Sequence, residues 1–203
     1  MNILAIGSHP DDIEYGCGGT LIKFKKTGHN IFLLVMTKGE MGGNPKIRFQ
    51  EQKKSARLIG AELFWGGVKD TNFPLNKSVI NKVEQIIAKV QPGLILVHSF
   101  NDTHQDHRKI SQATTTATRY IRNVLFYEGP TTTEFSPAVF VDIGETVEEK
   151  YSLIKCHHSQ VHQTKIPDLT ITESVHSCAI FRGFQHRVKY AEGFVPLRLS
   201  LFL

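Results

Sequence analysis

The N-terminal stretch Asn2-Ile3-Leu4-Ala5-Ile6-Gly7-Ser8-His9-Pro10-Asp11-Asp12 joins an apolar run to a turn that carries one imidazole and two adjacent carboxylates. The run up to residue 7 is typical of a parallel strand that is buried on both faces. A helix over residues 18–26, with Gly28 at its end, and a second buried strand over residues 31–36 follow. The order strand, helix, strand predicts a right-handed crossover between parallel strands.

The same alternation continues along the chain. Apolar runs predict further strands over 62–65, 94–97, 124–127 and 138–143, and helical periodicity indicates helices over 48–59, 79–90, 109–122 and 147–158. Segment 177–181 fits either a helix or a strand, and 190–203 is expected to be irregular with one strand. The pattern predicts an α/β fold, a Rossmann-like three-layer sandwich with a mostly parallel sheet and helices on both faces. We recognise no linker, so we expect a single domain over residues 1–203.

Composition narrows the class of protein. A hydrophobic content of 40% and a charged content of 21% are typical of globular domains. We recognise neither a bilayer-spanning run nor a secretory signal, so we expect a cytoplasmic protein without stable membrane insertion. The three cysteines are widely spaced and odd in number, which argues against a disulfide framework. The net charge of +5 comes from scattered lysines and arginines, so we expect no nucleic-acid partner.

A second polar cluster, His104-Gln105-Asp106-His107, follows the apolar run over residues 94–97. The carboxyl ends of parallel strands meet at one edge of a sheet, where ligands bind, so we expect the two clusters to face each other. Two imidazoles and one carboxylate, from His9, Asp12 and His107, suit Zn²⁺ and leave a position open for water. Fe²⁺ or Mn²⁺ could also occupy such a site.

The neighbouring residues could supply the rest of a hydrolytic mechanism. Asp11 lies between two of the ligands in sequence and could act as a general base on a zinc-activated water. His104 could stabilise an oxyanion or protonate a leaving amine, and Asp106 could orient an imidazole. Each motif alone is ambiguous, because proline and aspartate are also common turn residues. Together they meet the requirements of metal-assisted amide hydrolysis.

These paired motifs resemble those of the PIG-L/LmbE-like superfamily of zinc-dependent de-N-acetylases. Further similarity lies in Thr37-x-Gly39-Glu40-x-Gly42, Arg48-x-x-Glu51, Ala56-Arg57, Gly60, residues 140–143, Lys150, His158-Ser159-Gln160 and residues 190–194. The resemblance implies the ligands and catalytic roles given above, and it adds Arg48 and Asp70 as residues that bind sugar hydroxyls. It also implies a small-molecule substrate, an N-acetylglucosamine-type conjugate that loses its acetyl group, and a homo-oligomer, either a trimer or a hexamer.

Other interpretations stay open at this point. The glycine cluster over residues 16–19 could hold a phosphate, as in a non-hydrolytic nucleotide- or sugar-binding protein with a structural metal. A dinucleotide fingerprint, however, needs G-x-G-x-x-G directly after the first strand, where this chain has His-Pro-Asp-Asp. Close packing of a helix against the first strand is the preferred explanation of the glycines. Residues 160–176 do not resemble the longer specificity loops of some family members, so the sugar conjugate is not predicted.

Overall fold

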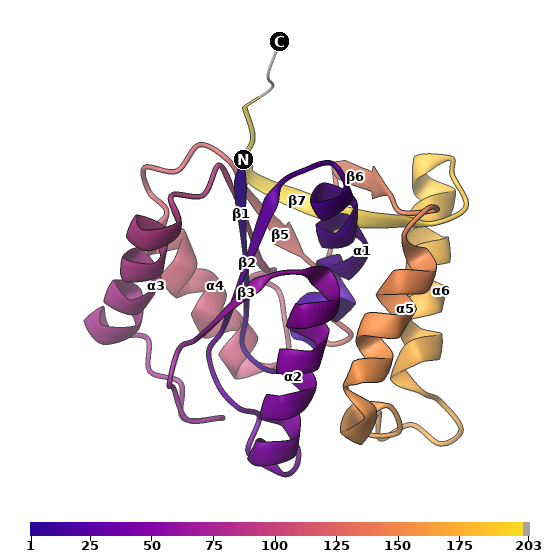
Figure 1. Cartoon of the computed structure of the whole chain (residues 1–203), viewed down its shortest axis with the longest axis horizontal. Helices are drawn as coiled ribbons and strands as arrows, with labels where there is room; N and C mark the ends of the chain where they lie inside the picture. Colours follow the sequence, from indigo (N-terminus) through magenta and orange to yellow (C-terminus); the bar gives the residue numbers. More distant parts are fainter. Residues whose placement is uncertain (201–203) are drawn as a thin grey trace.

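The computed structural model describes residues 1–200 and contains a seven-stranded sheet of order β3-β2-β1-β4-β5-β7-β6 (Figure 1). The strands are β1 (Asn2–Gly7), β2 (Asn30–Val35), β3 (Glu62–Trp65), β4 (Leu94–His98), β5 (Val124–Tyr127), β6 (Val139–Asp142) and β7 (Ala191–Arg198). The first five are parallel, whereas β7 runs antiparallel to both β5 and β6. The predicted Rossmann-like, mostly parallel sheet is confirmed.

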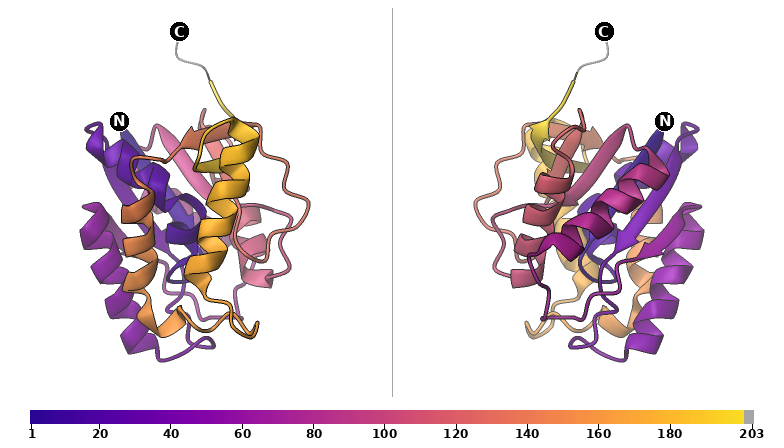
Figure 2. Two further views of the ribbon diagram at one scale, coloured as in Figure 1. Left: turned by 90° about the vertical axis from the view of Figure 1, so that its right-hand side faces the viewer. Right: turned by 90° about the vertical axis from the view of Figure 1, so that its left-hand side faces the viewer.

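Helices cover both faces of this sheet (Figures 1 and 2). One face carries α1 (Asp12–Lys26), α2 (Pro45–Ile59), α5 (Val147–Cys156) and α6 (Ile171–His186), and the other carries α3 (Lys77–Val90) and α4 (Gln105–Ala117). A short 3₁₀ helix, η1 (His158–Gln160), follows α5. Figure 2 shows α5 and α6 side by side on the face that also carries α1 and α2. None of the helices within residues 1–200 is long and apolar enough to cross a bilayer.

The strand order reverses between β1 and β4. Strands β2 and β3 follow β1 on one side of it, and β4 lies on the other side of β1. The loops after β1 and β4 therefore leave the same edge of the sheet in opposite directions and open a crevice between them, where ligands bind in folds of this kind. Both polar clusters of the sequence lie in these two loops.

Helix α1 starts earlier than predicted, at Asp12 instead of residue 18, and bends at Cys17. The bend exposes the amides of Gly19 and Thr20, which donate to the carboxylate of Glu192 at 2.9 Å and 2.7 Å. Buried Lys150 pairs with the same carboxylate. These two amides are therefore taken by a protein carboxylate, which removes the phosphate cradle proposed for the glycine cluster.

The glycines serve close packing, although not against the first strand. A Cβ on Gly16 would lie 2.1 Å from Cδ2 of Tyr127 in β5, and one on Gly18 would lie 3.2 Å from Leu153 in α5. Only a residue without a side chain lets α1 approach β5 this closely. Tyr127 is fully buried and donates its hydroxyl to the carbonyl of Ile6 at 2.8 Å, so it joins β5 to β1 beneath the crevice.

Other boundaries differ from the predicted ones. Helix α4 covers residues 105–117 instead of 109–122, because His104 caps its N-terminus by accepting from the Asp106 amide. The ambiguous segment 177–181 lies inside α6, which begins with a capping box formed by Thr170 and Glu173. Segment 190–203 contains the regular strand β7, and its residues 201–203 lie outside the described part of the chain.

Candidate active site

The crevice between the loops after β1 and β4 gathers the imidazoles and carboxylates that the sequence singled out. His9 follows β1 and Asp12 opens α1, whereas His107 lies in the first turn of α4. Each of these three side chains is at most 9% exposed. The turn is tight because the amide of His9 donates to Asp12 Oδ2 at 2.6 Å.

The three predicted metal ligands lie next to one another. Asp12 Oδ2 is 3.3 Å from His9 Nδ1, and Asp12 Oδ1 is 3.4 Å from His107 Nε2. On the far side of each ring a carboxylate meets the other nitrogen, Asp70 at 3.0 Å from His9 Nε2 and Asp102 at 3.1 Å from His107 Nδ1. A carboxylate there holds the ring proton, which leaves the nitrogen facing Asp12 with a free lone pair. This arrangement is the one that a metal-binding imidazole needs.

Several donor sets overlap in the crevice. Donor atoms within 4.8 Å of one another come from His9 with His104 and His107, from Asp12 with His98 and His107, and from His9 with Asp70 and Asp106. The relative orientation of the imidazole rings indicates which of these residues can direct their lone pairs at one ion. The lone pair of an imidazole lies in the ring plane, so a coordinated zinc lies in that plane about 2.0–2.1 Å from the nitrogen.

The ring of His98 stacks on that of His107 at 3.9 Å and 11°, and the ring of His104 stacks on it at 4.5 Å and 21°. Two nearly parallel rings direct their in-plane lone pairs along similar lines, so an ion shared by His107 with either of these rings is disfavoured. The ring of His9 is tilted by 54° to that of His107, so the planes of these two rings cross. The geometry therefore fits one ion held by His9, Asp12 and His107.

Asp11 occupies a strained backbone position beside this donor set. Its φ of 91° lies in the left-handed region, which is uncommon for a residue with a side chain and is found at functional sites. The Asp11 amide donates to Gln52 Oε1 at 3.3 Å, and Arg48 Nη2 lies 3.4 Å from Asp11 Oδ2. Burial raises the pKa of the Asp11 carboxyl to about 6, against the opposing charges of Arg48 and His157. The carboxyl is therefore largely ionised, and able to act as a base, above about pH 6.

A buried polar cluster supports the Asp11 turn from behind. Glu14 accepts hydrogen bonds from Gln52 at 2.6 Å and from Ser55 at 2.5 Å, and its second oxygen is 3.5 Å from His157 Nε2. Burial alone would raise the pKa of Glu14, but the charge and hydrogen bond of His157 outweigh it and the pKa is lowered. Sequence reasoning missed this cluster. The spacing of residues 48, 52 and 55, on one face of α2, is the signal that could have found it.

His104 caps the N-terminus of α4, and Asp106 lies in its first turn, whereas the sequence had placed both residues in the loop before this helix. The His104 amide donates to Asp102 at 2.8 Å, and the ring atom Nδ1 of His104 accepts from the Asp106 amide at 3.2 Å. A neutral His104 ring therefore carries its proton on Nε2. Asp106 is fully buried, accepts from the Thr71 amide at 2.9 Å and lies 3.5 Å from His9 Nε2. It thus faces the His9 ring together with Asp70.

Arg48 and Asp70, which were predicted to bind sugar hydroxyls, are buried and make internal contacts. Arg48 donates to the carbonyls of Gly39 and Pro10 at 2.9 Å and 2.8 Å. Asp70 accepts from the Met41 amide at 2.8 Å in addition to its contact with the His9 ring. These contacts show that both side chains fix the loops around the crevice. Sugar binding by them stays a prediction.

His98 and Asp102 are two site residues for which we predicted no role. Asp102 accepts from His104, Thr131 and Thr132 and holds the His107 ring, and His98 meets Asp12 Oδ2 at 3.0 Å. Both lie in the stretch that leads from β4 to the His-x-x-His cluster. Their position at the carboxyl end of a buried strand was the available signal.

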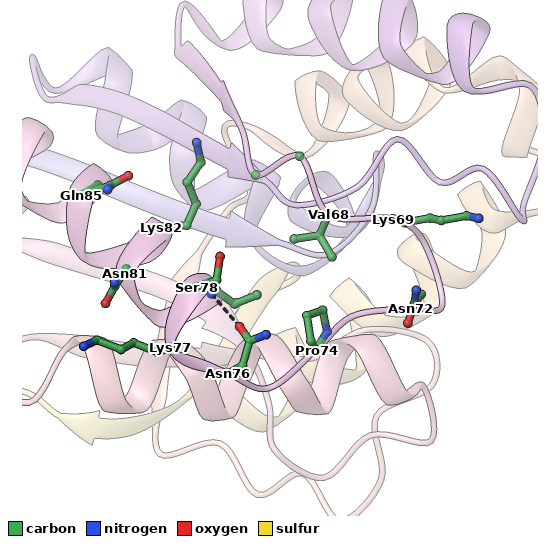
Figure 3. Close-up of a pocket in the computed structure, with 13 residues that line it drawn as sticks. Val68, Lys69, Asn72, Pro74, Asn76, Lys77, Ser78, Asn81, Lys82 and Gln85 are labelled. Atoms are coloured by element: carbon green, nitrogen blue, oxygen red, sulfur yellow. Dashed lines mark hydrogen bonds between the residues drawn. The ribbon is translucent and has the colours of Figure 1, made fainter.

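A surface hollow lies away from the crevice (Figure 3). It measures about 780 Å³ and lies between the loop of residues 66–74 and the start of α3. Lys69, Lys77 and Lys82 line it, and its lining contains no histidine, cysteine or acidic residue. Asp70 belongs to the same loop, but its carboxylate contacts His9 on the crevice side. This hollow lacks the groups that hydrolysis requires.

Comparison with known proteins agrees with this geometry. The family described as PIG-L, GlcNAc-PI de-N-acetylase, matches residues 4–118, more than half of the chain and the part that contains both clusters. The chain belongs to the PIG-L family. A relative in this family, the uncharacterized deacetylase YaiS of Escherichia coli, is 35% identical over 80% of the chain and 90% of its own length.

PIG-L relatives with a named substrate extend over the chain as well. The diacetylchitobiose deacetylase of Thermococcus kodakarensis is 27% identical over 96% of the chain and 83% of its own length. The solved structure of the N,N′-diacetylchitobiose deacetylase from Pyrococcus horikoshii superposes with a TM-score of 0.84 at 26% identity, covering 97% of this chain and 83% of that one.

The same fold also supports other chemistry. The 4-carboxy-2-hydroxymuconate hydratase GalB from Pseudomonas putida superposes with a TM-score of 0.85 at 22% identity, over 100% of this chain and 99% of that one. This likeness concerns the fold alone, since fold does not determine reaction. The reaction must therefore be inferred from the side chains in the crevice.

Proposed function

We propose that this chain is a zinc-dependent amidohydrolase that removes the acetyl group from an N-acetylglucosamine-type sugar conjugate. The main support is the ring geometry of the crevice, which favours His9, Asp12 and His107 as the metal ligands and leaves Asp11 and His104 beside them. Family membership and the two diacetylchitobiose deacetylases support an acetylated amino sugar as the class of substrate. Fe²⁺ or Mn²⁺ also suits two imidazoles and one carboxylate.

Each residue has one task in this proposal. When bound, zinc supplies Lewis-acid chemistry that polarises the amide carbonyl and makes water acidic near neutral pH. Asp11 takes a proton from the attacking water as the general base. The Nε2–H group of neutral His104 donates a hydrogen bond to the developing oxyanion, and the proton that Asp11 has taken passes to the leaving nitrogen. The C–N bond breaks, and the products are acetate and the free amino sugar.

The remaining carboxylates and the arginine hold this machinery in place. Asp70 and Asp106 face the same nitrogen of His9 and keep its ring oriented, a role that metal sites commonly give to carboxylates. Arg48 joins the loop after β1 to the loop after β2 through the carbonyls of Pro10 and Gly39, and it partly neutralises Asp11. Contacts of Arg48 and Asp70 with sugar hydroxyls remain part of the proposal.

The test measures metal content and acetate release with N,N′-diacetylchitobiose and a panel of N-acetylglucosamine conjugates. We expect about one zinc per chain and an activity that a chelator removes and zinc restores. Asp11→Asn should lower turnover by about 10²–10⁴-fold, the usual contribution of a general base. The matched control Asp168→Asn, on an exposed residue that also has positive φ, should not change it.

Two outcomes would overturn the proposal. Undiminished turnover in Asp11→Asn would remove the base assignment. A protein that binds zinc but releases no acetate from any conjugate would instead be a binding protein with a structural metal.

A further inference from the structure

His98 is a buried histidine that the proposed reaction does not use. It ends β4, is 1% exposed and lies between the ring of His107 at 3.9 Å and that of Tyr127 at 4.8 Å. Its Nε2 is 3.0 Å from Asp12 Oδ2, and its Nδ1 is buried without a hydrogen-bond partner. Its nearly parallel stacking on His107 makes His98 an unfavourable second ligand of the same ion. A different task must explain its contact with Asp12.

The position of the His98 proton follows from its surroundings. A carboxylate oxygen offers only lone pairs, so the contact with Asp12 is favourable only when Nε2 carries the hydrogen. The Ser8 amide also lies near Nε2, at 3.4 Å. It would donate a hydrogen bond to Nε2 in the other tautomer, in which the ring proton is on Nδ1. That tautomer would leave the Nδ1–H group buried without an acceptor and set two lone pairs against each other at 3.0 Å. The Nε2–H tautomer turns a ring donor toward the Ser8 amide at 3.4 Å, but the charge-assisted hydrogen bond to the Asp12 carboxylate at 3.0 Å is the stronger of the two, so the Nε2–H tautomer is the stable one.

This hydrogen bond decides which oxygen of Asp12 is free. Oδ2 accepts from the His9 amide at 2.6 Å and from His98 Nε2 at 3.0 Å, which uses both of its lone pairs. Oδ1 has no such donor and faces His107 Nε2 at 3.4 Å. The carboxylate is therefore held so that a single oxygen remains for a cation.

We propose that His98 is a positioning residue that fixes the Asp12 carboxylate through an Nε2–H···Oδ2 hydrogen bond, so that Asp12 presents only Oδ1 to the metal. This inference deepens the proposed function and rests on its metal site. With Asp70 on His9 and Asp102 on His107, each of the three ligands then has its own buried partner. Loss of such a partner typically weakens metal binding by about 10–100-fold.

Two substitutions separate the hydrogen bond from the packing. The amide nitrogen of a glutamine is as many bonds from Cβ as histidine Nε2, whereas that of an asparagine corresponds to Nδ1. His98→Gln can therefore keep the bond to Asp12, and His98→Asn cannot. We expect the zinc dissociation constant, measured on metal-free full-length protein by competition with a chromophoric chelator, to rise about 10–100-fold in His98→Asn. In His98→Gln it should stay within about threefold of the wild type, with similar melting temperatures for both metal-free variants.

Equal zinc affinity in His98→Asn and the wild type, or equal weakening in both variants, would overturn the inference. Should a variant fail to fold, ¹⁵N NMR of histidine-labelled wild type decides: an Nε2–H signal for His98 supports the hydrogen bond, and an Nδ1–H signal refutes it. These readouts are independent of turnover. If the zinc dissociation constants of the wild type and the two variants follow the expected order but the wild type releases no acetate, the proposed function is refuted and this inference stands. If the wild type binds no divalent cation, both are refuted.

Discussion

Replacing Glu14 by glutamine should destabilise the protein in a pH-dependent way. The substitution keeps the shape of the side chain but removes the charge opposite His157, and both groups are fully buried. Removing one partner of a buried ion pair costs about 3–5 kcal/mol, because the remaining charge is left without compensation. For a chain of this length, each kcal/mol lowers the melting temperature by about 2–4 °C. We therefore expect a loss of about 6–20 °C when the pair is fully charged.

The pH dependence comes from His157. The pKa of Glu14 is lowered, so this carboxylate is ionised at neutral pH and contributes down to acidic pH. Burial alone would lower the pKa of His157, but the charge of Glu14 outweighs it and raises the pKa above the ordinary 6.5. Stability that depends on protonated His157 is complete below pH 6.5 and is lost as pH rises through the folded-state pKa. The cost of Glu14→Gln should therefore be largest near pH 5.5 and should shrink at alkaline pH.

Chemical denaturation of both proteins at about pH 5.5 and about pH 8.5 measures this cost as a difference in unfolding free energy. Glu149→Gln is the matched control, since Glu149 pairs with Lys26 on the surface with both side chains largely exposed. Such pairs contribute about 0–1 kcal/mol, so the control should change little at either pH. A cost of Glu14→Gln that is the same at both pH values would refute the charged state assigned to the buried pair.

Further predictions concern the floor and the support of the crevice. Gly16→Ala should lower stability by about 1–3 kcal/mol, because its Cβ would overlap Tyr127, whereas Gly129→Ala, whose Cβ would meet only a Thr132 atom at 3.9 Å, should be tolerated in thermal melts. Gln52→Ala should lower kcat about tenfold with little change in KM or zinc content, because the Asp11 turn loses one of its supports. An equal fall in zinc content would show that Gln52 acts on the ligands instead.

Much of the fold could be predicted because apolar strands alternate with amphipathic helices. The start of α1 could not, since the glycines at 16, 18 and 19 look like helix breakers. The amides of Gly19 and Thr20 at the bend are satisfied by Glu192, which lies more than 170 residues later in the chain. The type of α6 was also ambiguous, because the apolar residues of its segment 177–181 fit the period of a helix and that of a strand. The capping box that marks the start of the helix, at Thr170, lies outside that segment.

The candidate site was predictable where strand topology alone places residues together. His9 and His107 follow neighbouring strands, and parallel pairing brings such positions to one edge. The partners of these residues were harder to predict. Asp70 and Asp102 reach the imidazoles through loops whose conformation depends on tertiary contacts, and nothing in their local sequence distinguishes them from turn formers.

Strand β7 has a consequence for the order in which the molecule is made. It lies between β5 and β6 and supplies Glu192, yet 48 residues separate the end of β6 from its start in the chain. During translation β6 can emerge from the ribosome but has no sheet neighbour to join, and the bend in α1 has no acceptor for its amides. In the nascent chain, β6 can therefore join the sheet, and the bend in α1 can find its acceptor, only after β7 has been made.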